Sequence, residues 1–408
     1  MRILFLTQYF PPETGAPQNR LHSLALYFAG YKNDVTVLTA MPNYPQMRIF
    51  EEYRRKVYIH EREGPLTLHR SWIYTGAKKG VLPRLLNYFS FVFSAMFIGL
   101  MKIKRQDILI CESPPLFLGI TAIILSKSKR AKLIFNVSDL WPESVEKLGI
   151  IRNRILLKGA YGIEKWIYHK SVLVTGQTKG IIDNIRKRYP EISTYWLPNG
   201  IDFRQFDIEA DRRGIRKSWL APNDTFVVLY AGILGHAQGL EVILLAAEIL
   251  REKQNIKFIL VGDGPERSGL EDLAKKKHLT NTLFISNRPR NEMPSIISAC
   301  NAYIVPLKKL DLFLGAIPSK IFEPLAMGKP IILGVDGEAR NLFIEKGQCG
   351  LFYEPENYSE LAQCILTLEQ DRNLAYHLGE NGRNYVSENF DRAKIADEFH
   401  TKLIQLNK

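Results

Sequence analysis

The stretch FVVLYAGILGHAQGL, residues 226 to 240, decides the fold class. Its first five residues are aliphatic or aromatic, which is typical of a buried strand. Gly232, Gly235 and Gly239 follow, and glycines let a backbone approach a ligand closely just before a helix begins. A strand that enters a helix through such a loop is the building unit of a parallel α/β sheet, and the loop can hold a phosphate. The G-x-G-x-x-G spacing and the P-loop lysine are both missing, which disfavours a dehydrogenase or a P-loop enzyme.

The same rhythm of strand and helix extends in both directions along the chain. Further strands are expected near 257–261, 282–285, 301–305, 330–333 and 350–353, and before the quoted stretch near 2–7, 34–39, 107–110, 132–136, 171–175 and 194–197. Helical segments separate them, so the sequence predicts two doubly wound parallel sheets. Ligands of such sheets bind beyond the carboxyl ends of the strands, so we expect the site in a cleft between the two sheets.

The polar stretch 202–224 has no strand period and divides the chain. We therefore expect an N-terminal domain over 1–200 and a second domain over 201–386. Four scattered cysteines form no C-x-x-C pair, which argues against a zinc site and fits a reducing compartment. The start, MRILFLTQYF, reads as a buried strand and not as a secretory signal, so we expect a cytoplasmic protein.

Charge is distributed unevenly over the 408 residues. The chain has a net charge of +13, but residues 1–200 carry 29 basic and 14 acidic groups, whereas the remainder carries 26 and 28. An anionic partner at long range is therefore met by the first half. Nucleic acid is disfavoured because no helical stripe of basic residues with interleaved aromatics, and no known binding motif, can be found. An anionic membrane surface is the other candidate.

The segment LLNYFSFVFSAMFIGLM, between Arg84 and Lys102, contains no charged residue. It is short for a transmembrane helix of about twenty residues. A buried crossover helix, a helix at a membrane surface and a true span all remain open. Basic neighbours favour the membrane surface, because each adds roughly 1 kcal/mol near anionic lipid; they are Arg54, Arg55, Lys56, Lys78, Lys79, Arg84, Lys102, Lys104 and Arg105. We expect Arg84, Phe89, Phe93 and Lys102 to contact membrane or lipid.

Candidate site residues in the first half follow the ends of strands. FPPETGAPQNR places Gly15 and Ala16 at a helix start, where backbone N–H groups can face an anion or a sugar. NVSDLWPES places Asp139 and Glu143 beside Trp141, a set that suits sugar hydroxyls and a stacking face. A capped helix with a core tryptophan explains the second pattern equally well.

In the second half, FLGAIPSKIFEPLAMGKPII predicts a helix over 318–328 with Ser319 and Lys320 at its positive end. An anion there would meet N–H groups, a hydroxyl and an ammonium group. Glu323, about one turn further, could accept both hydroxyls of a ribose. An ordinary serine-capped helix is the alternative.

Together these motifs resemble the bacterial glycosyltransferases of family 4, in particular the branch with L-fucosamine-type transferases of polysaccharide assembly. The resemblance spans nearly the whole chain. It rests on FPPETGA, SPPL (113–116), SDLWPES, LPNGID (197–202), YAGILG, VGDGPE (261–266), PSKIFEPLAMGKPI and GENGR (379–383).

The resemblance implies a GT-B fold, retention of configuration at the donor sugar, no metal and no cofactor. It implies that the second domain holds the nucleotide sugar, with Gly232, Gly235, Ser319, Lys320 and Glu323 as contacts. It also implies that a last helix, within 387–408, returns to the first domain. We expect Lys320, Glu323, Glu143 and Asp139 to be closest to the chemistry, and Gly15, Ala16, Trp141 and Asn199 to line the donor or acceptor loop.

Two departures from the family pattern affect the site. The family's usual pair of glutamates would lie at 315 and 323, but residue 315 is glycine. Many members have arginine and lysine where this chain has Ile233 and Gln238. We therefore expect Lys320, with Arg288 or His236, to supply the missing positive charge.

The resulting prediction is a retaining transferase of a hexose or N-acetyl-amino sugar. The donor would be a UDP-sugar, or less favoured a GDP-sugar, and the acceptor a sugar linked to a polyprenyl diphosphate. It would work at the inner face of a bacterial membrane, in capsule, O-antigen or exopolysaccharide synthesis. A nucleotide-sugar epimerase, a GT-B phosphorylase and a non-catalytic scaffold remain open as alternatives.

Overall fold

The computed structural model describes residues 1–407, apart from 14, 45, 46, 77–80, 148, 150, 152, 207–212 and 223. Lys78 and Lys79, expected beside the apolar helix, lie outside the described residues. The chain divides into two compact units. Unit 1 comprises Met1–Asn199 with Arg392–Lys408, and unit 2 comprises Gly200–Asp391.

Unit 1 is built on a sheet of eight strands within its described residues, in the order β3-β4-β2-β1-β5-β6-β7-β8. Neighbouring strands pair parallel except β3 and β4, which form an antiparallel edge. The strands are β1 (Arg2–Leu6), β2 (Asp34–Ala40), β3 (Tyr58–Glu63), β4 (Leu66–Ser71), β5 (Ile108–Ser113), β6 (Lys132–Val137), β7 (Leu173–Gly176) and β8 (Thr194–Trp196).

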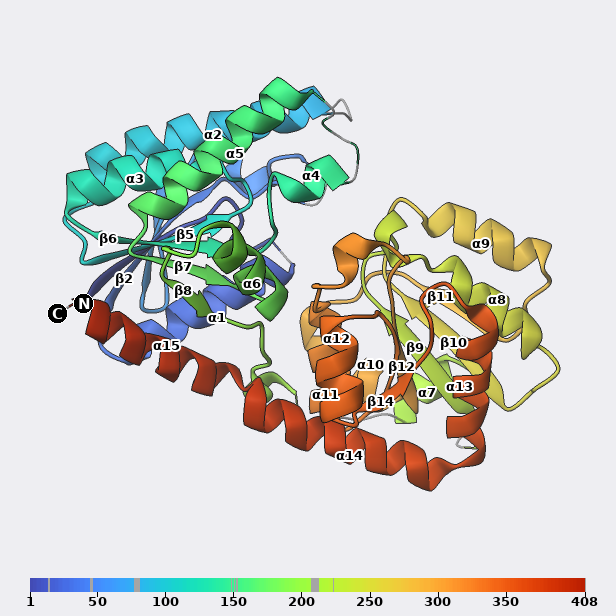
Figure 1. Ribbon diagram of the computed structural model, residues 1–408. Coiled ribbons are helices and arrows are strands. Elements are labelled where there is room, and N and C mark those ends of the chain that lie inside the picture. The colour runs from blue at the N-terminus through green and yellow to red at the C-terminus, as the bar shows by residue number, and fades with distance from the viewer. Residues whose placement is uncertain are drawn as a thin grey trace. The chain divides into compact units, whose positions relative to one another are not determined.

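Helices cover both faces of this sheet, because its strands are apolar on both sides. Side chains of β1 alternate between the faces: Leu4 and Leu6 pack under α2 and α3, whereas Ile3 and Phe5 pack under α1 and α15. Figure 1 shows α2, α3 and α5 on one side and α1 and α15 on the other. The helices are α1 (Ala16–Gly30), the short turn η1 (Glu51–Tyr53), α2 (Val81–Lys102), α3 (Leu118–Lys129), α4 (Glu143–Lys147), α5 (Arg154–Lys170), α6 (Lys179–Arg188) and α15 (Arg392–Asn407).

Unit 2 has a parallel sheet in the order β11-β10-β9-β12-β13-β14, as far as its described residues show. The strands are β9 (Phe226–Ala231), β10 (Ile256–Val261), β11 (Thr282–Ile285), β12 (Ala302–Pro306), β13 (Ile331–Gly334) and β14 (Gly350–Phe352). Apolar residues of α8, α9 and α13 fill one face of the sheet. The longer helices are α7 (Arg213–Ser218), α8 (Glu241–Ile249), α9 (Arg267–Lys276), α10 (Met293–Ser298), α13 (Tyr358–Gln370) and α14 (Arg372–Asn389).

Short helical turns carry much of the loop structure of unit 2. They are η2 (Phe203–Gln205), η3 (His236–Gln238), η4 (Arg290–Glu292), η5 (Asp311–Phe313), η6 (Ser319–Ile321), α11 (Phe322–Ala326), α12 (Glu338–Arg340) and the π-helical η7 (Asn341–Lys346). The helix expected over 318–328 is thus split into the turn η6 and the short α11. Pro324 removes one backbone donor from this stretch, which limits its regular hydrogen bonding.

The expected α/β fold with two Rossmann-like sheets is confirmed, and each expected strand is present with small shifts at its ends. The hairpin β3-β4 was not foreseen. Its first strand, YIHERE, carries charged residues at an edge of the sheet and is only partly buried, so it gives a weak apolar signal. Unit 2 continues to Asp391 because α14 continues to Asn389, so its boundary lies a few residues beyond 386.

Candidate functional site

The sheet of unit 2 reverses its winding between β9 and β12. From β9 the chain moves outward through β10 and β11, and then returns to β12 on the other side of β9. In such sheets ligands bind at the carboxyl ends of the strands where the order reverses. The loops that follow β9 and β12 therefore form the candidate site, and they carry Gly232 and Lys320.

Glycines allow two loops of this site to touch. Gly232 and Gly262 have φ angles of +147° and +146°, which side chains rarely permit. A Cβ atom on Gly262 would lie 1.9 Å from the carbonyl oxygen of Gly232. The loops after β9 and β10 are thus packed backbone against backbone, which keeps the first loop in one conformation.

Lys320 reaches this glycine loop from η6. Its Nζ donates to the hydroxyl of Tyr230 at 2.8 Å and to Oε1 of Gln238 at 2.9 Å. The ammonium also lies 4.3 Å from the centre of the Tyr230 ring. A Cβ on Gly232 would be 3.1 Å from Nζ. The lysine therefore sits beside the open backbone of the loop, and Gln238, at the position of the family's usual lysine, is its hydrogen-bond partner.

Burial lowers the pKa of Lys320 to about 7, while the nearby Glu323 acts in the opposite direction. Tyr230 and Gln238 offer it neutral oxygens only, so the ammonium is held without a full charge of opposite sign on either hydrogen-bond partner. An anion brought to the glycine loop would favour the charged form. This arrangement suits the phosphates of a nucleotide.

Glu323 and Arg290 lie together next to this lysine. An Nη2 of Arg290 is 3.8 Å from Oε1 of Glu323, and the Glu323 carboxylate remains partly exposed. Ser319 is exposed at the start of η6. Arg290 was not expected from the sequence. The expected arginine was Arg288, two residues earlier.

Arg288 and His236 do not share the environment of Lys320. Arg288 is exposed, with Glu292 at 3.8 Å. His236 lies beside Lys308, with 2.9 Å between Nε2 and Nζ, and Glu266 is 3.9 Å away. The polar partners of Lys320 within the described chain are Tyr230 and Gln238, and neither Arg288 nor His236 is among them.

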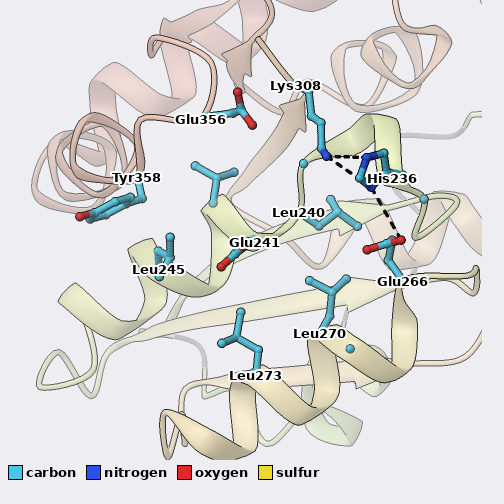
Figure 2. Close-up of a pocket in the computed structure, with 14 residues that line it drawn as sticks. His236, Leu240, Glu241, Leu245, Glu266, Leu270, Leu273, Lys308, Glu356 and Tyr358 are labelled. Atoms are coloured by element: carbon cyan, nitrogen blue, oxygen red, sulfur yellow. Dashed lines mark hydrogen bonds and ion pairs between the residues drawn. The ribbon is translucent and has the colours of Figure 1, made fainter. Parts of the chain in front are cut away.

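A separate hollow of about 660 Å³ opens next to His236 and Lys308 (Figure 2). It lies between α8 and α9, and Glu356 and Tyr358 close it on the side of α13. Leu240, Leu245, Leu270 and Leu273 give it an apolar floor. Lys320 and Glu323 are not part of its lining.

Unit 1 has a buried polar network at the carboxyl ends of its central strands. Arg20 of α1 donates from Nη2 to Glu112 at 2.6 Å and to Ser138 at 2.9 Å. Arg20 and Glu112 are both at least nine-tenths buried. Asn199 accepts from Arg20 at 3.2 Å, which brings one of the expected loop residues into the network. A glutamate inside the apolar strand ILICES was the signal in the sequence for this network.

The other expected residues of unit 1 have definite structural partners. Glu143 begins α4, forms an ion pair with Lys147 at 2.7 Å and accepts from Asn184 at 2.9 Å. Burial raises the pKa of Asp139. Trp141 packs edge-on against Phe117, with ring centres 5.2 Å apart.

Gly15 caps α1 in an extended conformation, and Ala16 is the first residue of that helix. A Cβ on Gly15 would meet the Gln18 side chain at 2.4 Å.

Helix α2 is the one described helix whose length and composition would allow it to cross a membrane, over Pro83–Lys102. One third of this window is buried. Exposed apolar side chains lie along it: Leu86, Phe93, Phe97, Leu100 and Met101. Phe89 is half-buried and packs against Phe117, with ring centres 4.7 Å apart.

Lys102 is exposed and lies 5.7 Å from the ring centre of Tyr58. Among the described residues, no group of three or more histidine, cysteine, aspartate or glutamate side chains is placed to hold a metal ion.

Comparison with known proteins identifies what the chain is similar to. Residues 211–385 match the family model described as "Glycosyl transferases group 1". The putative colanic acid biosynthesis glycosyl transferase WcaI of Escherichia coli K12 is 26% identical over 417 residues, which cover 98% of each protein.

Two solved structures share the fold. Sucrose-phosphate synthase from Thermosynechococcus elongatus matches with a TM-score of 0.76 and 17% identity, over 100% of this chain and 99% of that one. Anabaena Alr3699/HepE in complex with UDP-glucose matches with a TM-score of 0.73 and 18% identity, over 99% and 100%. At these identities the likeness establishes the fold, the GT-B type with two Rossmann-like domains.

Proposed function

We propose that the chain is a group 1 glycosyltransferase, because residues 211–385 match that family model, and that it transfers a sugar from a UDP-sugar to a polyprenyl-diphosphate-linked sugar. The reaction retains configuration and uses no metal. It takes place at the cytoplasmic face of a bacterial membrane, during synthesis of a surface polysaccharide. For the transferred sugar, a hexose and an N-acetyl-amino sugar both stay open.

The observation that carries the donor half is the position of Lys320 in the glycine loop after β9. A departing nucleoside diphosphate gains negative charge, so the enzyme must place positive charge there beforehand. Lys320 does this beside Gly232, where the open backbone leaves room for phosphate oxygens. UDP is favoured because Anabaena HepE, of the same fold, holds UDP-glucose.

Glu323 and Arg290 complete the donor half. Glu323 is partly exposed beside Arg290 and can accept the hydroxyls of a ribose. The oxocarbenium-like transition state is stabilised by the leaving phosphate on the reacting face, and this phosphate also takes the proton of the acceptor hydroxyl. No carboxylate at position 315 is then required for proton transfer.

The acceptor half rests on unit 1. Its sequence carries the excess of basic residues, and α2 exposes a row of apolar side chains that includes Phe93 and Phe97. A basic surface next to exposed apolar side chains suits peripheral binding to anionic lipid. The similarity to a colanic acid glycosyltransferase supports a role in surface polysaccharide synthesis.

The donor proposal is tested by thermal unfolding with UDP, with GDP and without nucleotide. A ligand at about 100 times its Kd stabilises by roughly 2.7 kcal/mol, which corresponds to about 5–10 °C for a unit of this size. We expect such a shift with UDP for the wild-type protein and none for Lys320→Ala. A shift with GDP alone would change the donor class, and no shift with either would contradict the donor site.

The membrane proposal is tested by co-sedimentation with vesicles that contain phosphatidylglycerol. Phe93→Ser with Phe97→Ser should release the protein into the supernatant, because two exposed apolar contacts are lost. Ile404→Ser, an exposed apolar residue on α15, is the matched control and should have no effect. Equal binding of both variants would show that α2 is not the membrane contact.

A further inference from the structure

Arg84, near the start of α2, lies on the side of the helix opposite its exposed apolar row. An α-helix turns about 100° per residue, so Arg84 and Phe93, nine residues apart, lie about 180° from each other. Tyr88 lies one turn from Arg84 and shares its side of the helix. Ala95, on the same side, is completely buried. Arg84 is therefore not part of the apolar face that was expected to contact the membrane together with it.

A buried hydrogen bond fixes this end of α2 to the end of β1. Gln8 donates from Nε2 to Asn87 at 2.8 Å, and Asn87 donates to the carbonyl oxygen of Tyr74 at 2.6 Å. Both Gln8 and Asn87 are almost completely buried. The side chains next to them in sequence, Tyr9 and Tyr88, are brought together by this bond, and their hydroxyls interact.

Arg84 lies among phenol groups. Its Nε donates to the Tyr88 hydroxyl at 3.0 Å, and its charge also acts on Tyr9 and Tyr44. Tyr9 and Tyr44 pack edge-on with ring centres 5.6 Å apart. Among the described residues, no carboxylate forms an ion pair with Arg84. Arg84 is exposed, so a ligand can reach its remaining N–H groups.

Glu13 is the carboxylate next to Arg84 and the three tyrosines, and it is occupied by hydrogen bonds from backbone N–H groups. It accepts from the backbone N–H groups of Asn43, Tyr44 and Phe10 at 2.6, 2.8 and 3.3 Å. It thereby holds the loops after β1 and β2 in place and is itself buried. It orients the tyrosines and does not pair with Arg84.

We infer that Arg84, with Tyr9, Tyr44 and Tyr88, binds a phosphate group of the lipid-linked diphosphate acceptor. A guanidinium group with free N–H donors and hydroxyls around it matches phosphate oxygens in charge and in hydrogen bonding. The site lies at the carboxyl ends of β1 and β2, where the sheet of unit 1 offers its ligand position. Phosphate of a membrane headgroup has the same chemistry, but Arg84 faces away from the apolar row of α2. This inference rests on the proposed acceptor class.

The test uses farnesyl diphosphate, a prenyl diphosphate without a sugar, titrated calorimetrically into the full chain saturated with UDP. UDP occupies the donor site, so the heat reports the second site. We expect Arg84→Gln to weaken binding by roughly tenfold to 100-fold, because a charge-assisted hydrogen-bond pair is lost. Lys104→Gln, an exposed basic residue just beyond α2, should bind as the wild type does.

Three results would overturn the inference: no binding of farnesyl diphosphate to the wild type, equal binding by Arg84→Gln, or a parallel loss of phosphatidylglycerol vesicle binding in Arg84→Gln. The last would assign Arg84 to a lipid headgroup. Tyr44→Phe, which keeps the ring and removes the hydroxyl, gives a second measurement if Arg84→Gln is unstable, and it should weaken binding severalfold. A failure of UDP to bind would instead contradict the donor half of the proposed function.

Discussion

Replacing Lys320 with glutamine should remove a pH dependence of UDP binding that the wild-type protein shows above neutral pH. Burial lowers the pKa of the free lysine to about 7. The phosphates of a bound nucleotide hold the proton on the lysine, so binding above this pH must be accompanied by proton uptake. The terminal phosphate of UDP ionises near pH 6 and is already fully charged in this range.

The magnitude follows from the pKa. Between about pH 7.5 and about pH 9.5 the protonated fraction of a lysine with a pKa of 7 falls by ~75-fold, and the Kd of UDP should rise by the same factor. A lysine with an ordinary pKa near 10.4 would change the Kd by only about 1.1-fold over this range. The two cases are far apart compared with the error of a titration.

Isothermal titration of UDP at several pH values, in two buffers with different ionisation heats, measures both the affinity and the proton uptake. Lys320→Gln should bind more weakly at pH 7 and show little pH dependence. Lys309→Gln, an exposed lysine paired with Glu354 at 2.7 Å, is the matched control and should follow the wild-type curve. A flat wild-type profile without proton uptake would refute the reasoning, because the lysine would then be charged before the nucleotide arrives.

Three further predictions concern stability. Gly262→Ala should lower the melting temperature by several degrees and weaken UDP binding, since the new Cβ would meet a backbone carbonyl at 1.9 Å. Gly269→Ala is the control: its Cβ would meet no neighbouring atom, so the same melts should show no change or a stabilisation of up to about 1 kcal/mol. Arg20→Ala should lower the free energy of unfolding by about 3–5 kcal/mol in denaturant titrations, because it leaves Glu112 buried without its ion-pair partner. The double variant Arg20→Ala with Glu112→Ala should lose less than the sum of the two single variants. Glu13→Ala should cost about 2–3 kcal/mol by leaving backbone N–H groups without an acceptor. Burial raises the pKa of Glu13 to about 7, so between about pH 4.5 and about pH 7 the folded state keeps a proton that the unfolded chain has lost. Glu13 therefore makes the stability of the wild-type protein fall as the pH rises through this range. Glu13→Ala should lack this slope in melts, and an unchanged slope would contradict the raised pKa.

The strands and the glycine loop were predictable because their signals are local. Six consecutive apolar residues before Gly232 are enough to predict both the strand and the place where it ends. Lys320 was identified because a serine and a lysine stand at a predicted helix start. A second reason was that this chain has the neutral Gln238 where many family members have a lysine. The split of that helix into η6 and α11 was not predictable from periodicity alone, since proline and glycine interrupt too short a segment.

Long-range polar partners could not be predicted. Arg20 and Glu112 are 92 positions apart, and they meet because α1, which carries Arg20, follows β1, the strand that pairs with the Glu112 strand β5. The side of α2 on which Arg84 lies could likewise not be predicted from the sequence. A charge count treats Arg84 and Lys102 alike as basic ends of one apolar helix, whereas the hydrogen bond between Gln8 and Asn87 rotates Arg84 toward the tyrosines.

The return of α15 to unit 1 has a consequence for the order of folding during synthesis. Phe399 and Leu403 of α15 are completely buried against the α1 face of the first sheet, where Phe28 and Phe399 have ring centres 6.1 Å apart. The part of this apolar face that α15 covers therefore stays exposed until α15 has left the ribosome. Unit 2 is contiguous in sequence and can close its core before then. The domain that begins at the N-terminus is thus the last to be completed, and a ribosome that stalls late would release a folded donor-side unit attached to an unfinished acceptor-side one.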